Sequence, residues 1–339
     1  MKILICGGAG FIGSNYVRYT LDHSDDEVVV LDKLTYAGNL DNLAAFAGEA
    51  RYTFVRGDIA DAEGVRTVMD GIDAVVNFAA ESHVDRSILD PGGFITTDVY
   101  GAYVLLDAAR ASGVGRFVQV STDEVYGEVI GESSMEDAPL RPRSPYSASK
   151  AGAEHLVQAY FVTYGLPTLI TRGSNTFGPY QYPEKLIPVV ITEAFDDQSV
   201  PIYGDGLQIR DWLFVEDHCS GIDAVLRLGE PGEAYNIGGG NLRTNVELVE
   251  RILELLGKPS TLIEHVSDRP GHDRAYSIDS TKLLRLGWNR NPSFDQALAA
   301  TVKWYVDHED WWRRVKATAD YQTYFQRNYG DRESFAVPR

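Results

Sequence analysis

Two adjacent acidic residues, Asp123 and Glu124, follow an apolar run over residues 116–121 that predicts a buried strand. They stand where that strand leaves the core, in the stretch STDEVYGE (121–128). Two carboxylates that share a site repel each other when both are ionised, so one holds a proton while its neighbour stays anionic. Such a pair could remove one proton as a base and deliver another as an acid.

A glycine-rich turn, GGAGFIG, follows the first apolar run and opens a helical stretch. Gly7, Gly10 and Gly13 permit a tight turn and close approach of the backbone to a pyrophosphate, which the helix N-terminus attracts. Asp32 ends the next strand, 19 residues after Gly13. Its carboxylate suits the adenosine ribose hydroxyls and repels a 2′-phosphate. The segment predicts an NAD site, the alternative being a turn without a ligand.

A tyrosine and a lysine, Tyr146 and Lys150, lie four residues apart in YSASK at the start of a helical stretch. This spacing places both side chains on one helix face. The ammonium, together with a positive nicotinamide ring, would stabilise a phenolate and lower the pKa of Tyr146, making it a base at neutral pH. The pattern alone is also common on protein surfaces, so its weight comes from the preceding dinucleotide site.

Strand-like and helix-like segments alternate over the first 170 or so residues, which predicts a parallel sheet with helices on both faces. We expect an α/β fold: a Rossmann-type, doubly wound parallel sheet with a smaller C-terminal α/β lobe. The domains are placed at 1–174, interleaved with later segments, and 175–339, including an aromatic-rich tail that docks. The expected strands are 2–8, 27–32, 52–58, 73–80, 116–121 and 168–174, and the expected helices include 11–23, 100–113 and TNVELVERILELLG (244–257).

The composition excludes several classes of protein. A formal net charge of −18 argues against binding to nucleic acid or to an anionic membrane. The N-terminal apolar run is too short for a secretory signal, and no run is long enough to span a membrane. Cys6 and Cys219 are expected to be buried thiols of a reducing cytoplasm. Clustered Cys/His ligands are absent from the sequence, so no metal is expected.

Taken together, these motifs resemble the extended short-chain dehydrogenase/reductase superfamily, in its nucleotide-sugar branch. Within it the chain is similar, essentially end to end, to the dTDP-glucose 4,6-dehydratases. The stretches that carry the similarity are DKLTYAGNLDNL (32–43), AAESHVDRSI (79–88), STDEVYG (121–127), SPYSASKAGAEHL (144–156), GPYQYPEKLIP (178–188), YGDGLQIRDWLFVEDH (203–218) and DRPGHDRAYSID (268–279).

The resemblance implies an oxidation, an elimination and a reduction on dTDP-glucose, with NAD⁺ regenerated in each turnover. Tyr146 takes the C4 hydroxyl proton as hydride leaves, and Thr122 holds that hydroxyl. Glu124 then removes the C5 proton, Asp123 protonates the departing C6 hydroxyl, and hydride returns to C6. A 4-epimerase or decarboxylase would use the same cofactor but leave the acid pair without a task. A non-enzymatic NAD-binding sensor would have little use for Tyr146, Lys150 and both acids.

The resemblance also assigns the binding residues. The implied catalytic residues are Thr122, Asp123, Glu124, Tyr146 and Lys150. The implied cofactor residues are Gly7, Gly10, Phe11, Ile12, Gly13, Asp32, Lys33, Thr35, Gly38, Asp58, Ile59, Phe78, Ala79, Ala80, Ser82, Thr97, Ser121, Tyr146 and Lys150. The implied substrate residues are Ser82, His83, Thr122, Asn175, Glu184, Lys185, Leu186, Pro201, Tyr203, Arg210, Asn245, Arg269 and His272.

Two further expectations follow from the resemblance. Where the family has Asn-Asn-Tyr before Gly-Pro, this chain has Asn175, Thr176 and Phe177, which could alter the loop or the fit of the sugar. The apolar helices near 100–113 and after Tyr146 are expected to pair across a two-fold axis as a four-helix bundle, making a homodimer. The alternative is burial of these helices under the chain's own C-terminal lobe.

Overall fold

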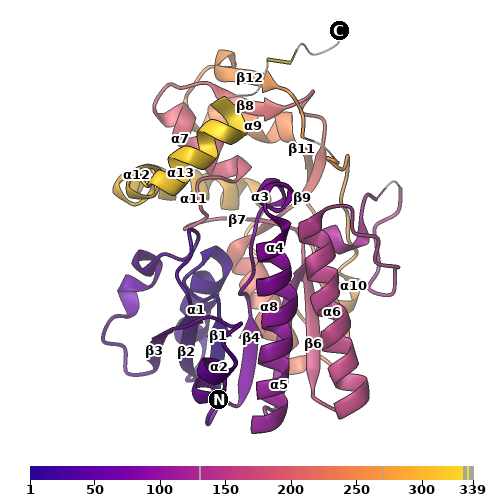
Figure 1. The fold of residues 1–339 in the computed structure, drawn as a ribbon. Coiled ribbons are helices and arrows are strands. Elements are labelled where there is room, and N and C mark those ends of the chain that lie inside the picture. Colours follow the sequence, from indigo (N-terminus) through magenta and orange to yellow (C-terminus); the bar gives the residue numbers. More distant parts are fainter. Residues whose placement is uncertain (130, 270, 331–333, 336–339) are drawn as a thin grey trace.

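The computed structural model describes residues 1–129, 131–269, 271–330 and 334–335. Within these ranges the larger lobe contains a seven-stranded sheet in the order β10-β6-β5-β4-β1-β2-β3. Every neighbouring pair is parallel, which confirms the predicted fold class (Figure 1). The strands are β1 (Lys2–Cys6), β2 (Glu27–Asp32), β3 (Tyr52–Arg56), β4 (Ala74–Asn77), β5 (Arg116–Thr122), β6 (Thr168–Gly173) and β10 (Ala234–Ile237).

Side chains along the sheet alternate between two apolar cores. Ile3 and Ile5 of β1 belong to one core, and Leu4 and Cys6 belong to the other. The alternation follows from the two-residue period of a strand, and both faces are apolar because helices cover both. Cys6 and Cys219 are buried free thiols, as predicted.

The two faces are covered by different helices (Figure 1). Helices α1 and α8 pack together and supply one core, whereas α2, α5 and α6 supply the other. The expected helix at 100–113 begins as a π-helical turn, Ile95–Gly101, and becomes regular only at Ala102. The bounds are α1 (Phe11–His23), α2 (Ala62–Val68), α3 (Val84–Leu89), α4 (Pro91–Phe94), α5 (Ala102–Ser112), α6 (Pro145–Tyr164) and α8 (Val215–Leu228).

Helix α6 is bounded by strong local signals at both ends. Ser144 and Ser147 form a capping box, and Pro145 occupies the first turn, where its missing N–H costs nothing. Gly165 ends the helix in the left-handed conformation at φ 70°. These signals set Tyr146 in the first turn and Lys150 one turn later.

The smaller lobe lies beyond the carboxyl ends of the sheet (Figure 1). It contains a three-stranded sheet, β11-β9-β7, and a parallel pair, β12-β8. The expected helix at 244–257 is α9, whose Thr244–Glu247 capping box sets its start. The remaining bounds are β7 (Asn175–Phe177), β8 (Val200–Tyr203), β9 (Ile209–Phe214), β11 (Leu242–Thr244), β12 (Ile263–Val266), α7 (Leu186–Phe195), α9 (Asn245–Leu256), α10 (Thr281–Leu284), α11 (Phe294–Asp307), α12 (Glu309–Lys316) and α13 (Ala319–Phe325).

The aromatic-rich tail packs against this lobe as far as the structure describes it. Tyr321 and Tyr324 of α13 are buried, and the Tyr321 hydroxyl donates to the Pro183 carbonyl over 3.2 Å. Residues 331–333 and 336–339 of the predicted docked tail lie outside the described residues, as does Pro270 of the DRPGHDRAYSID motif. None of the described helices combines the length and the apolar character that crossing a membrane requires.

The glycine-rich turn should tolerate no side chain at Gly13. A Cβ there would lie 2.8 Å from the Gly8 Cα and closer still to the Gly7 carbonyl oxygen. Gly13→Ala should lower the free energy of unfolding by about 2 kcal/mol or more, measured by urea titration. Gly92→Ala is the control, because its Cβ would come no nearer than 3.7 Å to its neighbours. Equal losses in the two variants would contradict this prediction.

Candidate active site

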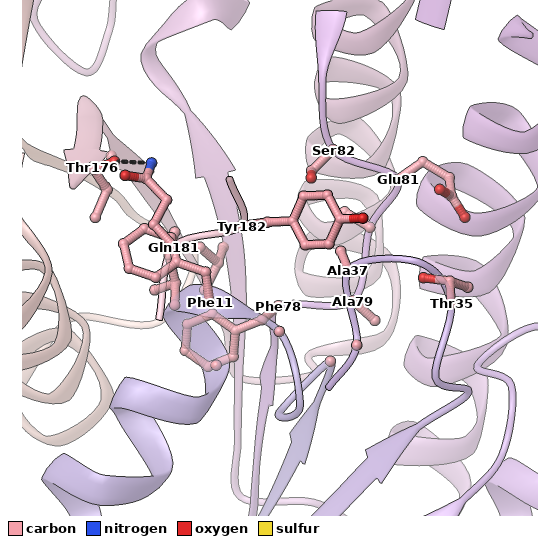
Figure 2. A pocket seen from close by; sticks show the side chains of 18 of the residues that line it. Phe11, Thr35, Ala37, Phe78, Ala79, Glu81, Ser82, Thr176, Gln181 and Tyr182 are labelled. Atoms are coloured by element: carbon pink, nitrogen blue, oxygen red, sulfur yellow. Dashed lines mark hydrogen bonds between the residues drawn. The ribbon is translucent and has the colours of Figure 1, made fainter. Parts of the chain in front are cut away.

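A cavity of about 350 Å³ opens at the carboxyl ends of the sheet strands. Its wall includes the ends of β2, β5 and β6 together with segments of the smaller lobe. Figure 2 shows part of it, with Gln181 hydrogen-bonded to Thr176 and the Tyr182 ring beside the loop that carries Ser82. Every residue predicted to bind the cofactor lines the cavity: Gly7, Gly10, Phe11, Ile12, Gly13, Asp32, Lys33, Thr35, Gly38, Asp58, Ile59, Phe78, Ala79, Ala80, Ser82, Thr97, Ser121, Tyr146 and Lys150.

The Asp32 side chain holds the glycine-rich turn by a hydrogen bond to its backbone. One carboxylate oxygen accepts from the Ala9 N–H over 2.9 Å, and the other accepts from the Leu34 N–H over 2.8 Å. Burial raises the pKa of Asp32, and these two bonds oppose the rise. Each oxygen keeps a further lone pair for a ligand hydroxyl. Lys33 lies 3.6 Å from both Asp58 and Glu81, so its charge is already engaged.

Tyr146 and Lys150 both face the cavity from α6. Lys150 is 5% exposed, and its ammonium donates to the Val120 carbonyl over 2.7 Å. Burial lowers the pKa of Lys150, whereas the charges of Asp98 and Glu154 raise it. The lysine is therefore held against the end of β5 by a single hydrogen bond to the backbone.

The expectation of a lowered tyrosine pKa is wrong for the protein by itself. Burial raises the pKa of Tyr146 well above its ordinary value, and the charges of Glu124 and Asp98 raise it further. Hydrogen bonding with Thr122 opposes the rise. Burial first, and then the charges of the neighbouring acids, keep Tyr146 as a neutral phenol.

The acid pair lies in a 3₁₀ turn, Asp123–Tyr126, that Thr122 caps. The Thr122 hydroxyl accepts from the Glu124 N–H and donates to the Asp123 carboxylate, each over 3.2 Å. Asp123 is 2% exposed and does not line the cavity, whereas Glu124 does. Burial, then the charges of Glu124 and Asp211, raise the pKa of Asp123 well above its ordinary value.

Glu124 differs from its neighbour in the cations that face it. Burial also raises the pKa of Glu124, but the charges of Arg269, Arg210 and Lys185 oppose the rise. Asp123 is therefore the member that keeps its proton more readily. Burial is the largest cause of the rise at both acids, and the repulsion from Glu124 that the sequence emphasised is the second cause at Asp123.

A second cluster of predicted residues gathers around Asp85. Its carboxylate accepts from Arg269 over 2.8 Å and from the Tyr203 hydroxyl over 2.9 Å, with His83 3.9 Å away. Burial alone would raise the pKa of Asp85, but His83, Arg269 and these hydrogen bonds hold it well below its ordinary value. Burial keeps His83 neutral at pH 7, so Arg269 supplies the lasting charge.

Glu184 is linked to the tail through Arg86. The Arg86 guanidinium donates to Glu184 over 2.9 Å and to Asp320 of α13 over 3.0 Å. It also lies 3.7 Å from the ring centre of Tyr36 and 4.4 Å from that of Tyr324. Arg86 thus connects Tyr36 in the loop after β2, the predicted substrate residue Glu184, and helix α13.

Arg210 and His272, two more of the predicted substrate residues, also belong to the smaller lobe. Arg210 is buried, donates to the Ile209 carbonyl over 2.8 Å and to the Asp273 carbonyl over 2.9 Å, and stacks on Tyr276. His272 is held by Asp268 at 2.7 Å. Some of the predicted substrate residues line the cavity, namely Ser82, Asn175, Lys185 and Leu186. The others do not, namely His83, Thr122, Glu184, Pro201, Tyr203, Arg210, Asn245, Arg269 and His272.

The departure at 176–177 has a local explanation. Phe177 is fully buried and packs on Phe214 and Phe294 at 5.8 and 5.7 Å, away from the cavity. Thr176 lines the cavity and donates its single hydroxyl proton to the Ser174 carbonyl. His218 must therefore donate its Nδ1 proton to Thr176 over 2.8 Å, which fixes the tautomer of this buried imidazole.

Several residues of the site escaped the sequence analysis. The cavity is also lined by Gln181, Tyr182, Trp212 and His218, and by Thr176, which the sequence marked only as a departure from the family motif. They come from β7, from the loop after it and from β9 and α8, and no short-range spacing links them. Asp98 is a buried acid just before the predicted helix at 100–113, and no motif in the sequence marks it.

Comparison with known proteins decides the family. The sequence profile of the GDP-mannose 4,6 dehydratase family matches residues 4–301. The chain belongs to this 4,6-dehydratase family. It is 54% identical to a dTDP-glucose 4,6-dehydratase of Streptomyces griseus, over 91% of this chain and 95% of the relative. It is 53% identical to the low-salt glycan biosynthesis protein Agl12 of Haloferax volcanii, over 91% of this chain and all of the relative.

A solved structure extends the comparison. DesIV, a dTDP-glucose 4,6-dehydratase from Streptomyces venezuelae solved with NAD and dTDP bound, superposes with a TM-score of 0.92. The two are 50% identical over 93% of this chain and all of DesIV. The resemblance to dTDP-glucose 4,6-dehydratases drawn from the motifs is therefore confirmed. In this 4,6-dehydratase, Phe177 is a core residue, so the altered motif changes the cavity wall at Thr176 only.

Loss of the Asp85 charge should destabilise the protein. Asp85→Asn leaves the largely buried Arg269 without its partner, which should cost about 3 kcal/mol in the free energy of unfolding. In the wild type this contribution is present above the ordinary aspartate pKa and is lost as pH falls, because the pKa is lowered in the folded state. Urea titration measures it. Asp320→Asn, which removes an exposed partner of Arg86, should cost under about 1 kcal/mol. A loss for Asp85→Asn as small as that control would contradict the prediction.

Proposed function

We propose that this protein converts dTDP-glucose to dTDP-4-keto-6-deoxyglucose and water as an NAD-dependent hydro-lyase. The observation that carries the proposal is the meeting of Glu124, Tyr146 and Lys150 at one cavity, with the buried acid Asp123 beside them. The similar dTDP-glucose 4,6-dehydratases support the same substrate and the same cofactor. Its biosynthetic role is the supply of deoxysugar nucleotides.

The cavity suits NAD. A Cβ on Gly7 would lie 2.6 Å from the Ala79 backbone nitrogen, so only glycine lets the turn pack this closely on the segment after β4, which also lines the cavity. The Asp32 carboxylate keeps acceptor capacity at the β2 end, and Lys33 is engaged by two acids rather than free for a 2′-phosphate. Bound NAD⁺ would accept hydride from sugar C4 and return it to C6. We assign the nineteen cavity residues named above to its binding.

Tyr146 handles the proton of the C4 hydroxyl in this proposal. Its pKa is raised in the protein alone, so the positive charges of Lys150 and of the oxidised cofactor must offset Glu124 and Asp98. Thr122 contacts Tyr146 and the acid turn together, which suits it to orient the C4 hydroxyl. Ser121 lines the nicotinamide side of the cavity.

The acid pair carries out the elimination. Glu124, which faces three cations, removes the C5 proton. Asp123 is protonated and donates its own proton to the C6 hydroxyl, which leaves as water. A 4-epimerase or a decarboxylase would not require this buried acid, and an NAD-binding sensor would require none of these groups. Asp123 does not line the cavity, whereas Glu124 does. Asp123 therefore reaches the sugar only if the substrate binds on the Asp123 side of Glu124.

The substrate-side residues form the other half of the proposed site. We assign the diphosphate to Arg210, Arg269 and His272, since guanidinium groups bind diphosphates bidentately. The remaining proposed substrate contacts are Ser82, His83, Thr122, Asn175, Glu184, Lys185, Leu186, Pro201, Tyr203 and Asn245. We divide the chain into an NAD domain at 1–174 and a nucleotide-sugar lobe at 175–339, with β10 and α8 returning to the first.

We also propose a cytoplasmic homodimer. Large side chains are exposed along these two helices: Tyr100 just before α5, Tyr103 on α5, and Val162 and Tyr164 on α6. Val162 is 73% exposed. Helices α5 and α6 pack against each other, and a second copy would complete a four-helix bundle. The two buried thiols suit a reducing compartment.

Glu124→Gln tests the reaction. Loss of the base should slow exchange of the C5 hydrogen and formation of the 4-keto-6-deoxy product by roughly 10²–10⁴-fold. Oxidation at C4 should persist, so reduced cofactor should accumulate and be visible in its absorbance. Glu132→Gln, an exposed residue of the following loop, is the control. Near-normal turnover of dTDP-glucose by Glu124→Gln would remove Glu124 from this role.

Val162→Glu tests the dimer. A charge on the bundle face should turn the dimer into monomers, because burying it without a partner is costly. Leu228→Glu, which alters an exposed apolar residue at the end of α8, should leave the dimer intact. Sedimentation equilibrium at micromolar concentration measures both. A wild type that is monomeric under these conditions would contradict the proposal.

A further inference from the structure

The acid turn, Asp123–Tyr126, ends at a tyrosine that the proposed reaction does not use. Tyr126 is 5% exposed, and its side chain belongs to an apolar cluster with Ala151 of α6. Its hydroxyl accepts from the Arg172 guanidinium over 2.6 Å and donates to the Asn236 amide oxygen over 2.8 Å. Burial raises the pKa of Tyr126 to about 12, so the phenol keeps the proton that it donates at neutral pH.

Arg172 joins the acid turn to helix α6. It lies on β6, in register with Ser121 of β5, and is 6% exposed. Its Nε and Nη2 atoms donate to the two carboxylate oxygens of Glu154 on α6, over 2.7–3.2 Å. Its Nη1 atom donates to the Tyr126 hydroxyl over 2.6 Å and to the Glu136 carbonyl over 2.9 Å. One buried planar group therefore bridges the turn and the helix.

This bridge is rigid because all three guanidinium nitrogens are engaged. The donors of an arginine form a fixed planar fork, so Arg172 cannot turn toward one partner without losing another. Glu154, which is 2% exposed, supplies the opposite charge that a buried guanidinium requires. The distance between the Tyr126 hydroxyl and α6 is thereby fixed by a single side chain.

The two ends of the acid turn are held by different parts of the protein. Thr122, just before the turn, belongs to β5, and Tyr146 is set by the capped start of α6. Loss of the Tyr126 hydrogen bonds would therefore leave Thr122 and Tyr146 in place. It would release the segment between Thr122 and Tyr126, which carries the acid pair.

We propose that Arg172 and Tyr126 are positioning residues for the elimination: they hold the acid turn in place against α6. The inference rests on the proposed function, in which the acid pair and Tyr146 act on neighbouring carbons of one sugar. A displacement of about 1 Å between reacting groups can cost roughly a hundredfold in rate. Neither positioning residue lines the cavity, so both act through the acid turn rather than on the substrate.

Tyr126→Phe tests the bridge, because it removes the hydroxyl and keeps the ring. Exchange of the C5 hydrogen should slow by roughly tenfold to a hundredfold, while single-turnover oxidation at C4 stays within about twofold of the wild type. The KM for dTDP-glucose should change little, and reduced cofactor should accumulate. A merely structural role would slow both steps alike, and that result would overturn the proposal.

Tyr235→Phe is the matched control. Tyr235 is 2% exposed, and its hydroxyl accepts from the Glu230 N–H over 2.9 Å, which links β10 to the loop before it rather than to the acid turn. This variant should leave the ratio of the two steps unchanged. Arg172→Lys should repeat the split, because an ammonium lacks the planar fork that reaches both partners. A normal ratio in Arg172→Lys would also overturn the proposal.

Amide hydrogen exchange tests the same bridge without substrate or cofactor. The Gly127 N–H donates to the Glu124 carbonyl over 3.2 Å and closes the acid turn. This amide should exchange about tenfold or more faster in Tyr126→Phe than in the wild type, and at the wild-type rate in Tyr235→Phe. Should Tyr126→Phe fail to fold, Arg172→Lys carries both measurements.

The exchange measurement separates this inference from the proposed function. Unchanged Gly127 exchange in the variant of a protein that dehydrates dTDP-glucose would overturn the positioning role and leave the proposed function standing. Faster exchange in the variant of a protein that does not act on dTDP-glucose would overturn the proposed function and leave the bridge standing.

Discussion

The ionisable side chains where β5 ends and α6 begins lie largely inside the protein, and the chemistry of the site follows from the loss of solvation there. Burial is the largest cause of the pKa shifts of Asp123, Glu124, Tyr146 and Lys150. In each case it favours the neutral form. A reaction that needs an anion or a cation at one of these positions must therefore obtain it from a fixed charge nearby, and the position of those charges decides which group does what.

The fixed charges come from the smaller lobe. Arg210 opposes the pKa rise at both acids, Arg269 opposes it at Glu124, and Asp211 adds repulsion at Asp123. The pKa values of these two neighbouring residues are therefore raised to different extents because the residues face different partners. The distinction depends on docking of the two lobes, since the turn itself belongs to the larger one.

The sequence was informative where chemistry is local. The glycine-rich turn with Asp32, the capped start of α6 with Tyr146, and six of the seven sheet strands all depend on neighbours within a few residues. The Asp85 cluster was accessible only through resemblance, because Arg269 lies 184 residues from Asp85 in the chain. The raised pKa of Tyr146 was missed because its causes, burial and the acids Glu124 and Asp98, are tertiary. Strand β10 was missed because four residues carry too little pattern.

Arg86 shows how distant parts of the chain are held to one geometry. Its guanidinium contacts the rings of Tyr36 and Tyr324 and donates hydrogen bonds to Glu184 and Asp320. The loop that carries Tyr36 and helix α13 therefore both contact this one side chain. Arg86 thereby links α13 to Tyr36, whose hydroxyl donates to the Ser82 carbonyl. Helix α13 therefore supports the cavity through Arg86, although none of its own residues lines the cavity wall.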